Sequence, residues 1–190
     1  MNLLFPKFNW RLLPGMLLVA VIGALISGAY GVVHDQITYS VSEEYFSKMK
    51  FEQFDYADFG WPVRWFVAEI GFLATWWVGF FGGWFLARIA FPVWPFRIAF
   101  RKVMSGFLIM LACGLAGAIG GYLWGLWRMD AISPWVGMAE DLGIVDVGAF
   151  TRVGYIHLAG YVGGLVGLIG SIVALLRARK RVRSSGDAEI

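Results

Sequence analysis

Residues 12–33 have the sequence LLPGMLLVAVIGALISGAYGVV, which contains no charged side chain. An α-helix rises 1.5 Å per residue, so about 20 apolar residues cross the hydrocarbon core of a bilayer. Three further segments are predominantly apolar over a similar length, at 62–91, 103–127 and 153–176. The sequence therefore predicts an all-α, polytopic membrane protein with four transmembrane helices.

The composition agrees with this class of protein. Hydrophobic residues make up 59% of the 190 residues and charged residues 15%, and the mean hydropathy is +0.67. A soluble domain needs more polar side chains to cover its surface, so the lipid bilayer is the expected partner. The net charge is +3, but no basic patch interleaved with aromatic residues is present, which argues against nucleic acid as a partner. We expect one transmembrane domain, residues 1–190.

The charges between the apolar segments predict an orientation. Basic residues lie before the first segment, between the second and third, and after the fourth: Lys7, Arg11, Arg97, Arg101, Lys102, Arg177, Arg179, Lys180, Arg181 and Arg183. Acidic residues dominate the other two connections: Asp35, Glu43, Glu44, Glu52, Asp55 and Asp58, then Asp130, Glu140, Asp141 and Asp146. Cytoplasmic loops of membrane proteins carry the excess of Lys and Arg. We therefore expect both termini in the cytoplasm, with the acidic connections outside.

The first of these outer connections, residues 34–61, is the longest. Its aromatic and apolar residues alternate with charged ones: Tyr45, Phe46, Met49, Phe51 and Phe54 against Glu43, Glu44, Lys48, Lys50 and Glu52. This pattern is typical of an amphipathic helix at an interface. It predicts an element that lies on the membrane surface or caps the outer end of the bundle.

Small residues form a stripe on each of the last two apolar segments. They recur every three or four positions, at Gly114, Gly117 and Gly121 in the third segment and at Gly160, Gly164 and Gly167 in the fourth. Small side chains let helix backbones approach closely in lipid. We expect the stripes to be helix-packing faces, against each other or, in a homo-oligomer or membrane complex, against other chains.

Three ionisable residues are predicted at the outer ends of the helices. They are the two histidines, His34 and His157, and Glu69 in the second segment. An ionisable group inside a membrane helix is costly and marks a functional site by default. Two imidazoles and a carboxylate can ligate a divalent metal such as Zn²⁺, Fe²⁺ or Cu²⁺. His34, Glu69 and His157 are therefore candidate ligands. Asp35, Glu43 and Glu44 are further candidates, either as ligands or as acceptors of hydrogen bonds from the ligands.

Other interpretations of these residues stay open. The same groups could carry a proton or hold a polar head group, and hydrogen-bonded histidines could stabilise helix contacts without any chemistry. No local ligand spacing such as H-E-x-x-H is present. The sequence thus favours two functions about equally, a metal or acid–base site of a membrane-embedded enzyme and a non-catalytic scaffold or accessory subunit. It identifies no reaction.

The segment that leaves the first helix carries a resemblance. HDQITY at 34–39, EEYF at 43–46 and KFEQF at 50–54 form a pattern similar to one in uncharacterised bacterial four-helix membrane proteins. The resemblance implies a multi-pass protein of the bacterial inner membrane. It implies no activity, because no function is attached to that family.

Overall fold

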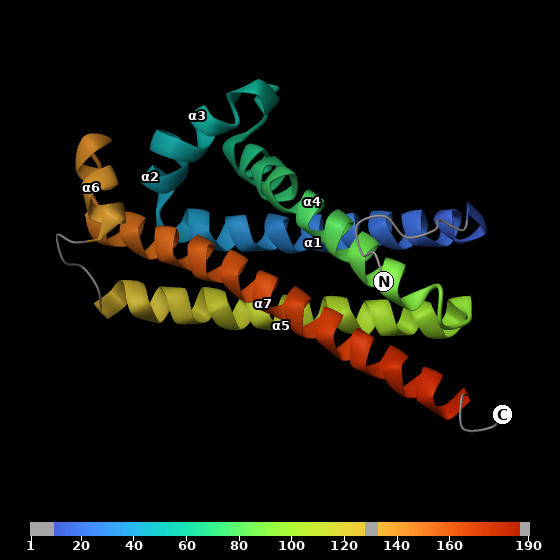
Figure 1. The fold of residues 1–190 in the computed structure, drawn as a ribbon. Helices are drawn as coiled ribbons and strands as arrows, with labels where there is room; N and C mark the ends of the chain where they lie inside the picture. Colours follow the sequence, from blue (N-terminus) through green and yellow to red (C-terminus); the bar gives the residue numbers. More distant parts are fainter. Residues whose placement is uncertain (1–9, 128–132, 187–190) are drawn as a thin grey trace.

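The computed structural model describes residues 10–127 and 133–186, and every regular element within these ranges is a helix (Figure 1). Four helices are long and apolar enough to cross a membrane: α1 (Leu13–Val41), α4 (Val63–Ala90), α5 (Phe96–Trp127) and α7 (Val147–Gly186). Of the charges used above to predict orientation, Lys7 and Asp130 lie outside the described residues.

Helix α1 continues through residues 34–41, although the apolar run ends at Val33. This polar extension is held by the start of α4. Arg64 Nη1 donates to the backbone oxygen of Gln36 at 3.1 Å and to Ser40 Oγ at 3.1 Å, and Gln36 Nε2 donates to the Arg64 carbonyl at 2.7 Å. His34 and the residue after it therefore lie on a helix and not in a loop.

Capping side chains set other helix ends. Ser42 has an extended backbone that ends α1, and its Oγ accepts a hydrogen bond from Tyr45 N at 3.2 Å, which begins α2 (Glu43–Tyr45). Asp146 Oδ1 accepts from Ala149 N at 2.8 Å at the start of α7, so this helix begins before residue 153. Helix α5 also begins early, directly after Pro95.

The first close helix pair is formed by α1 and α4. Their backbones meet at glycines on both helices: Gly23, Gly31, Gly71 and Gly79. A Cβ on any of these would collide with a backbone carbonyl of the opposite helix. Between them, Thr75 Oγ1 lies 2.8 Å from the Ser27 carbonyl of α1 and can donate to it. This antiparallel glycine contact is an addition to the helix-packing faces predicted on the third and fourth segments.

The second close pair is formed by α5 and α7. Gly117 and Gly121 lie against the backbone of Ala159 and Tyr155, and a Cβ on Gly167 would be 2.7 Å from the Cα of Met110. The other glycines of the predicted stripes have more room. Cβ atoms on Gly114 and Gly160 would make ordinary contacts, and one on Gly164 would meet nothing within 4 Å. These three glycines line a cavity between the two helix pairs.

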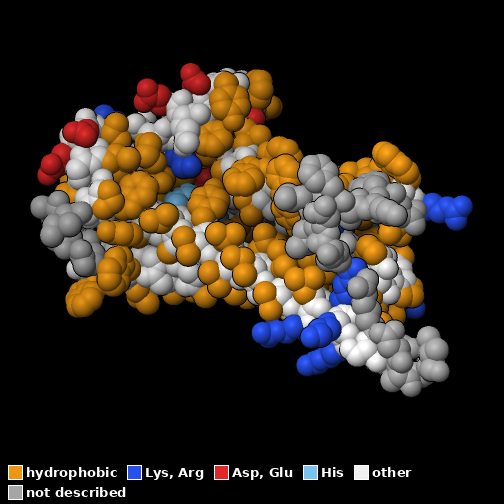
Figure 2. Space-filling view, in the orientation of Figure 1, with side chains coloured by type: hydrophobic (Ala, Val, Ile, Leu, Met, Phe, Trp, Pro, Cys, Tyr) orange, Lys and Arg blue, Asp and Glu red, His pale blue; other side chains and the backbone are white. Residues whose placement is uncertain are grey.

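A short helical segment packs onto one end of the bundle. It comprises α2, η2 (Phe46–Lys50) and α3 (Phe51–Gln53), and we call residues 42–62 the cap and this end the capped end. Tyr45 and Phe46 are buried with residues of α4, α6 (Pro134–Asp141) and α7: Val67, Ala139, Phe150 and Val153. In Figure 2 acidic side chains gather at the capped end, and Lys and Arg side chains gather at the opposite end.

Candidate functional site

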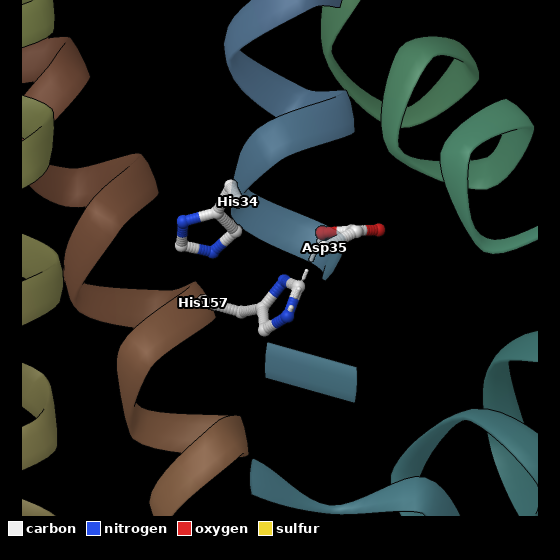
Figure 3. A group of neighbouring side chains, drawn as sticks. All are labelled: His34, Asp35 and His157. Atoms are coloured by element: carbon white, nitrogen blue, oxygen red, sulfur yellow. Dashed lines mark ion pairs between the residues drawn. The ribbon is translucent and has the colours of Figure 1, made fainter. Parts of the chain in front are cut away.

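His34 and Asp35 of α1 and His157 of α7 come together beneath the cap (Figure 3). One ligand atom of each residue lies within 4.8 Å of the other two. Asp35 is 2% exposed and His157 is 7% exposed, whereas His34 is half-buried. The imidazole centroids are 4.8 Å apart and the rings are nearly perpendicular, at 83°. Two imidazoles and one carboxylate thus face a common small space that could hold a metal ion.

The acidic member of this group is Asp35 and not Glu69. Asp35 was expected as a further ligand or as an acceptor for the ligands, and Glu69 as the carboxylate of the group. Glu69 lies two residues before Gly71, which faces α1, so helical geometry directs Glu69 to a different side of α4. Glu69 is half-buried, and it is not part of the group that His34 and His157 form.

The two glutamates of the cap also lie apart from the imidazoles. Glu43 is exposed. Glu44 accepts hydrogen bonds from the backbone N–H groups of Val145 at 3.0 Å and Asp146 at 2.8 Å. These two bonds hold the pKa of the Glu44 carboxyl below its ordinary value. Glu44 therefore ties the cap to the loop before α7.

Hydroxyl groups engage one nitrogen of each imidazole. His157 Nε2 lies 3.2 Å from Thr38 Oγ1, and His34 Nδ1 lies 3.5 Å from the hydroxyl oxygen of Tyr30. Thr38 Oγ1 is also 3.1 Å from the His34 carbonyl. Since a hydroxyl has one proton, Thr38 can donate to this carbonyl and accept from Nε2–H of His157. The second nitrogen of each ring is then left for another partner.

The Asp35 carboxylate lacks part of its hydrogen bonding. Its Oδ1 lies 3.9 Å from His157 Nε2, and its Oδ2 is buried without a hydrogen-bond partner among the described residues. An unsatisfied buried polar group costs about 1–3 kcal/mol, and more when it is charged. Such an atom calls for an ion, a water molecule or a proton.

Two residues of the cap, neither of them predicted as part of the site, complete the surroundings. The Tyr45 ring stacks on His157 at 5.2 Å with an interplanar angle of 20°, and burial raises the pKa of its hydroxyl. Lys50 is only 8% exposed, and burial lowers the pKa of its ammonium group, an effect that the Asp35 charge partly opposes. Thr38 follows His34 by four positions, so a helix predicted to extend past residue 33 would have placed both residues on the same face and indicated Thr38 as part of the site.

A cavity of about 80 Å³ continues from the site into the bundle. All four long helices line it. Beyond Tyr30 and Tyr161 its walls are mostly apolar, with Ile26, Val78, Phe107, Met110 and Leu111. The volume is enough for a few water molecules. Figure 2 shows histidine atoms on the floor of a hollow in the molecular surface, so the site is open to the outside of the protein.

The donor set suits a divalent metal with imidazole and carboxylate ligands, such as Zn²⁺ or Fe²⁺. Metal–ligand bonds of about 2.0–2.2 Å place neighbouring donors of a tetrahedral site roughly 3.4 Å apart. The three side chains, now within 4.8 Å, would close around an ion by small rotations. Three protein ligands leave at least one coordination position open.

The fold and the site together define a class: an all-helical protein with four helices able to cross a membrane and a largely buried His–Asp–His group at one end. Comparisons with protein-family models, curated proteins and solved structures find no match to this chain. Its function must therefore be argued from the chemistry of the site.

Proposed function

We propose that this chain is a multi-pass protein of the bacterial inner membrane, with both termini in the cytoplasm and the capped end outside. Four apolar helices of sufficient length support membrane insertion. The orientation rests on charge. The start of α5 carries Arg97, Arg101 and Lys102, whereas the cap carries five acidic residues, Glu43, Glu44, Glu52, Asp55 and Asp58.

This orientation is tested with reporter fusions. A periplasm-specific reporter placed after Gly60 or after Gly143, both exposed turn glycines, is expected to be active. A cytoplasmic reporter at the C-terminus is expected to be active as well. Cytoplasmic signal from Gly60 would reverse the orientation and place the His–Asp–His group on the inner side.

The function that the geometry supports best is binding of one divalent metal by His34, Asp35 and His157. The observation that carries this proposal is the group itself: one ligand atom of each of the three residues lies within 4.8 Å of the other two, and Asp35 and His157 are buried. A cation among these atoms would neutralise the buried carboxylate and bind the free imidazole nitrogens. Zn²⁺ and Fe²⁺ fit the two-nitrogen, one-oxygen donor set, and Cu²⁺ is the third candidate.

A metal held by three protein ligands would keep a position for water or substrate. Catalytic zinc sites have this arrangement, whereas structural zinc sites are closed by four protein ligands. The hollow seen in Figure 2 gives a path to the open position. We therefore favour a membrane-embedded enzyme in which the metal polarises a bound group. The rival function, a scaffold or accessory subunit, needs no ion.

Metal analysis of the detergent-purified protein separates these functions. The wild type is expected to contain about one ion per chain, and His157→Ala and Asp35→Asn to lose it while helix content is unchanged. Glu69→Gln is the matched control, because it removes a half-buried carboxylate outside the group. A metal-free wild type, together with full cellular function in His157→Gln, would establish the scaffold role instead.

A further inference from the structure

The metal site proposed above would leave positive charge uncompensated. A divalent ion brings two positive charges, and the Asp35 carboxylate cancels one. Lys50, also buried at the capped end, adds one more. With neutral imidazoles the sum is two positive charges. Excess positive charge in a largely buried site is unfavourable, so an anion of opposite charge would stabilise the loaded site.

Lys50 is the cation of the cap nearest to this group by its segment and charge. It lies in η2, the same helical segment as Phe46, whose ring is 6.4 Å from that of His157, and the Asp35 carboxylate raises the pKa of its ammonium group against the effect of burial. Its side chain is more than nine-tenths buried, and its nearest described partner is the face of Phe54, with Nζ 5.4 Å from the ring centroid. Among the residues that the structure describes it makes no ion pair or hydrogen bond, so its ammonium protons are available to a ligand.

We propose that the site binds a phosphate dianion, with one oxygen at the open metal position and another on the Lys50 ammonium. This inference rests on the metal site of the proposed function. A phosphate monoester or inorganic phosphate carries a charge of about −1.5 to −2 at neutral pH, which matches the excess charge of the site. The phosphate oxygens are arranged tetrahedrally, so two of them can contact two cations at once. A water molecule or a chloride ion has a single atom for both contacts and is less suited to this.

Two sources of this group fit the surroundings. One is free phosphate, which would enter through the hollow in Figure 2. The other is the phosphomonoester head group of a lipid such as phosphatidic acid. The apolar walls of the cavity below the site, among them Val78, Phe107 and Met110, suit the start of an acyl chain.

The test is phosphate binding to zinc-loaded protein, measured by equilibrium dialysis with radiolabelled inorganic phosphate. Lys50→Met is expected to bind phosphate at least about tenfold more weakly with unchanged zinc content, because it loses one charge-assisted hydrogen bond. Lys48→Met is the matched control, an exposed lysine of the same η2 segment, and should bind like the wild type. Lys50→Arg, which keeps the charge, should retain most of the affinity.

Competition identifies the source of the phosphate group. If dihexanoyl phosphatidic acid displaces phosphate at a concentration about tenfold or more below that of unlabelled phosphate, the ligand is a lipid. Equal potency supports free phosphate. Dihexanoyl phosphatidylcholine, whose head group has no net charge, should compete poorly, and competition equal to that of phosphatidic acid would contradict recognition of a dianion.

The failures of the two proposals are distinguishable. A wild type that binds none of Zn²⁺, Fe²⁺ and Cu²⁺ at equilibrium overturns the metal site, and with it this inference, before any phosphate is added. Zinc-loaded wild type that binds no phosphate, or Lys50→Met that binds it as tightly as the wild type, overturns the inference and leaves the metal site standing. Equal phosphate affinity of zinc-loaded and metal-free protein also overturns it.

Discussion

His157 Nε2 lies 3.2 Å from Thr38 Oγ1, a contact that joins α7 to the polar extension of α1. It exists only because α1 continues past Val33 and is held there by Arg64 of α4. The same extension places Asp35 beside His157. The cap, α1, α4 and α7 thus depend on one another for the geometry of the site.

Replacing Thr38 with valine is expected to weaken metal binding. Valine has nearly the same shape but cannot accept the hydrogen bond from His157, so the imidazole loses its fixed orientation. Loss of a hydrogen bond behind a metal ligand costs about 10–100-fold in metal affinity. Competition with a chromophoric chelator measures this affinity. Ser105→Ala, which removes an exposed hydroxyl bonded to its own helix, should leave it unchanged.

Removal of the metal should lower thermal stability. A ligand that binds only the folded state stabilises it by about 2.7 kcal/mol when its free concentration is 100 times Kd. Dialysis against a chelator should therefore lower Tm in the wild type, and re-addition of the metal should restore it. The His34→Ala variant should show the same Tm with and without chelator. A Tm of the wild type that does not respond to metal would argue against the site.

Gly117→Ala is expected to destabilise the α5–α7 pair. Its Cβ would collide with the backbone of Ala159, and relief of such overpacking costs about 1–3 kcal/mol. Gly120→Ala is the control on the same helix, since nothing lies within 4 Å of its Cβ and alanine has the higher helix propensity. Unfolding in mixed micelles compares the two variants. Equal destabilisation would mean that this interface is wrong.

The link between the cap and the loop before α7 should depend on pH. The N–H groups of Val145 and Asp146 hold the pKa of the Glu44 carboxyl below its ordinary value of 4.5. A depressed carboxyl pKa stabilises the folded link above this ordinary value, and the stabilisation is lost as the pH falls through the lower, folded-state pKa. Hydrogen exchange should therefore show these two amides protected at neutral pH and progressively less protected below about pH 4.5.

Two variants of the cap check that this effect belongs to Glu44. Glu44→Gln should expose both amides to exchange already at neutral pH and should remove the pH dependence, because a neutral side chain replaces the carboxylate. Glu43→Gln, at an exposed position, should behave like the wild type. Protection that persists in Glu44→Gln would show that other contacts hold the loop.

Much of the fold could be predicted from local composition. The four apolar segments predicted an all-helical chain with four helices able to span a membrane, and the structure has them. The predicted helix ends were less accurate. Residues 34–41 are mostly polar, yet they continue the helix, and hydrogen bonds from Arg64 hold them against α4. Hydropathy indicates how a segment interacts with its solvent. It does not predict that a polar stretch is helical when contacts with another helix stabilise it.

The sequence by itself determined that the chain has two histidines, that both belong near the acid-rich end, and that small residues allow close helix contacts. Tertiary structure alone decided that Asp35 and not Glu69 joins the histidines, that the cap brings Lys50 into the buried end, and that α1 pairs with α4 through glycines on both helices. The helical period fixes which residues of one helix share a face. The rotation and register of one helix against another depend on side-chain and backbone packing between segments that are far apart in the chain, so they cannot be derived from either segment alone.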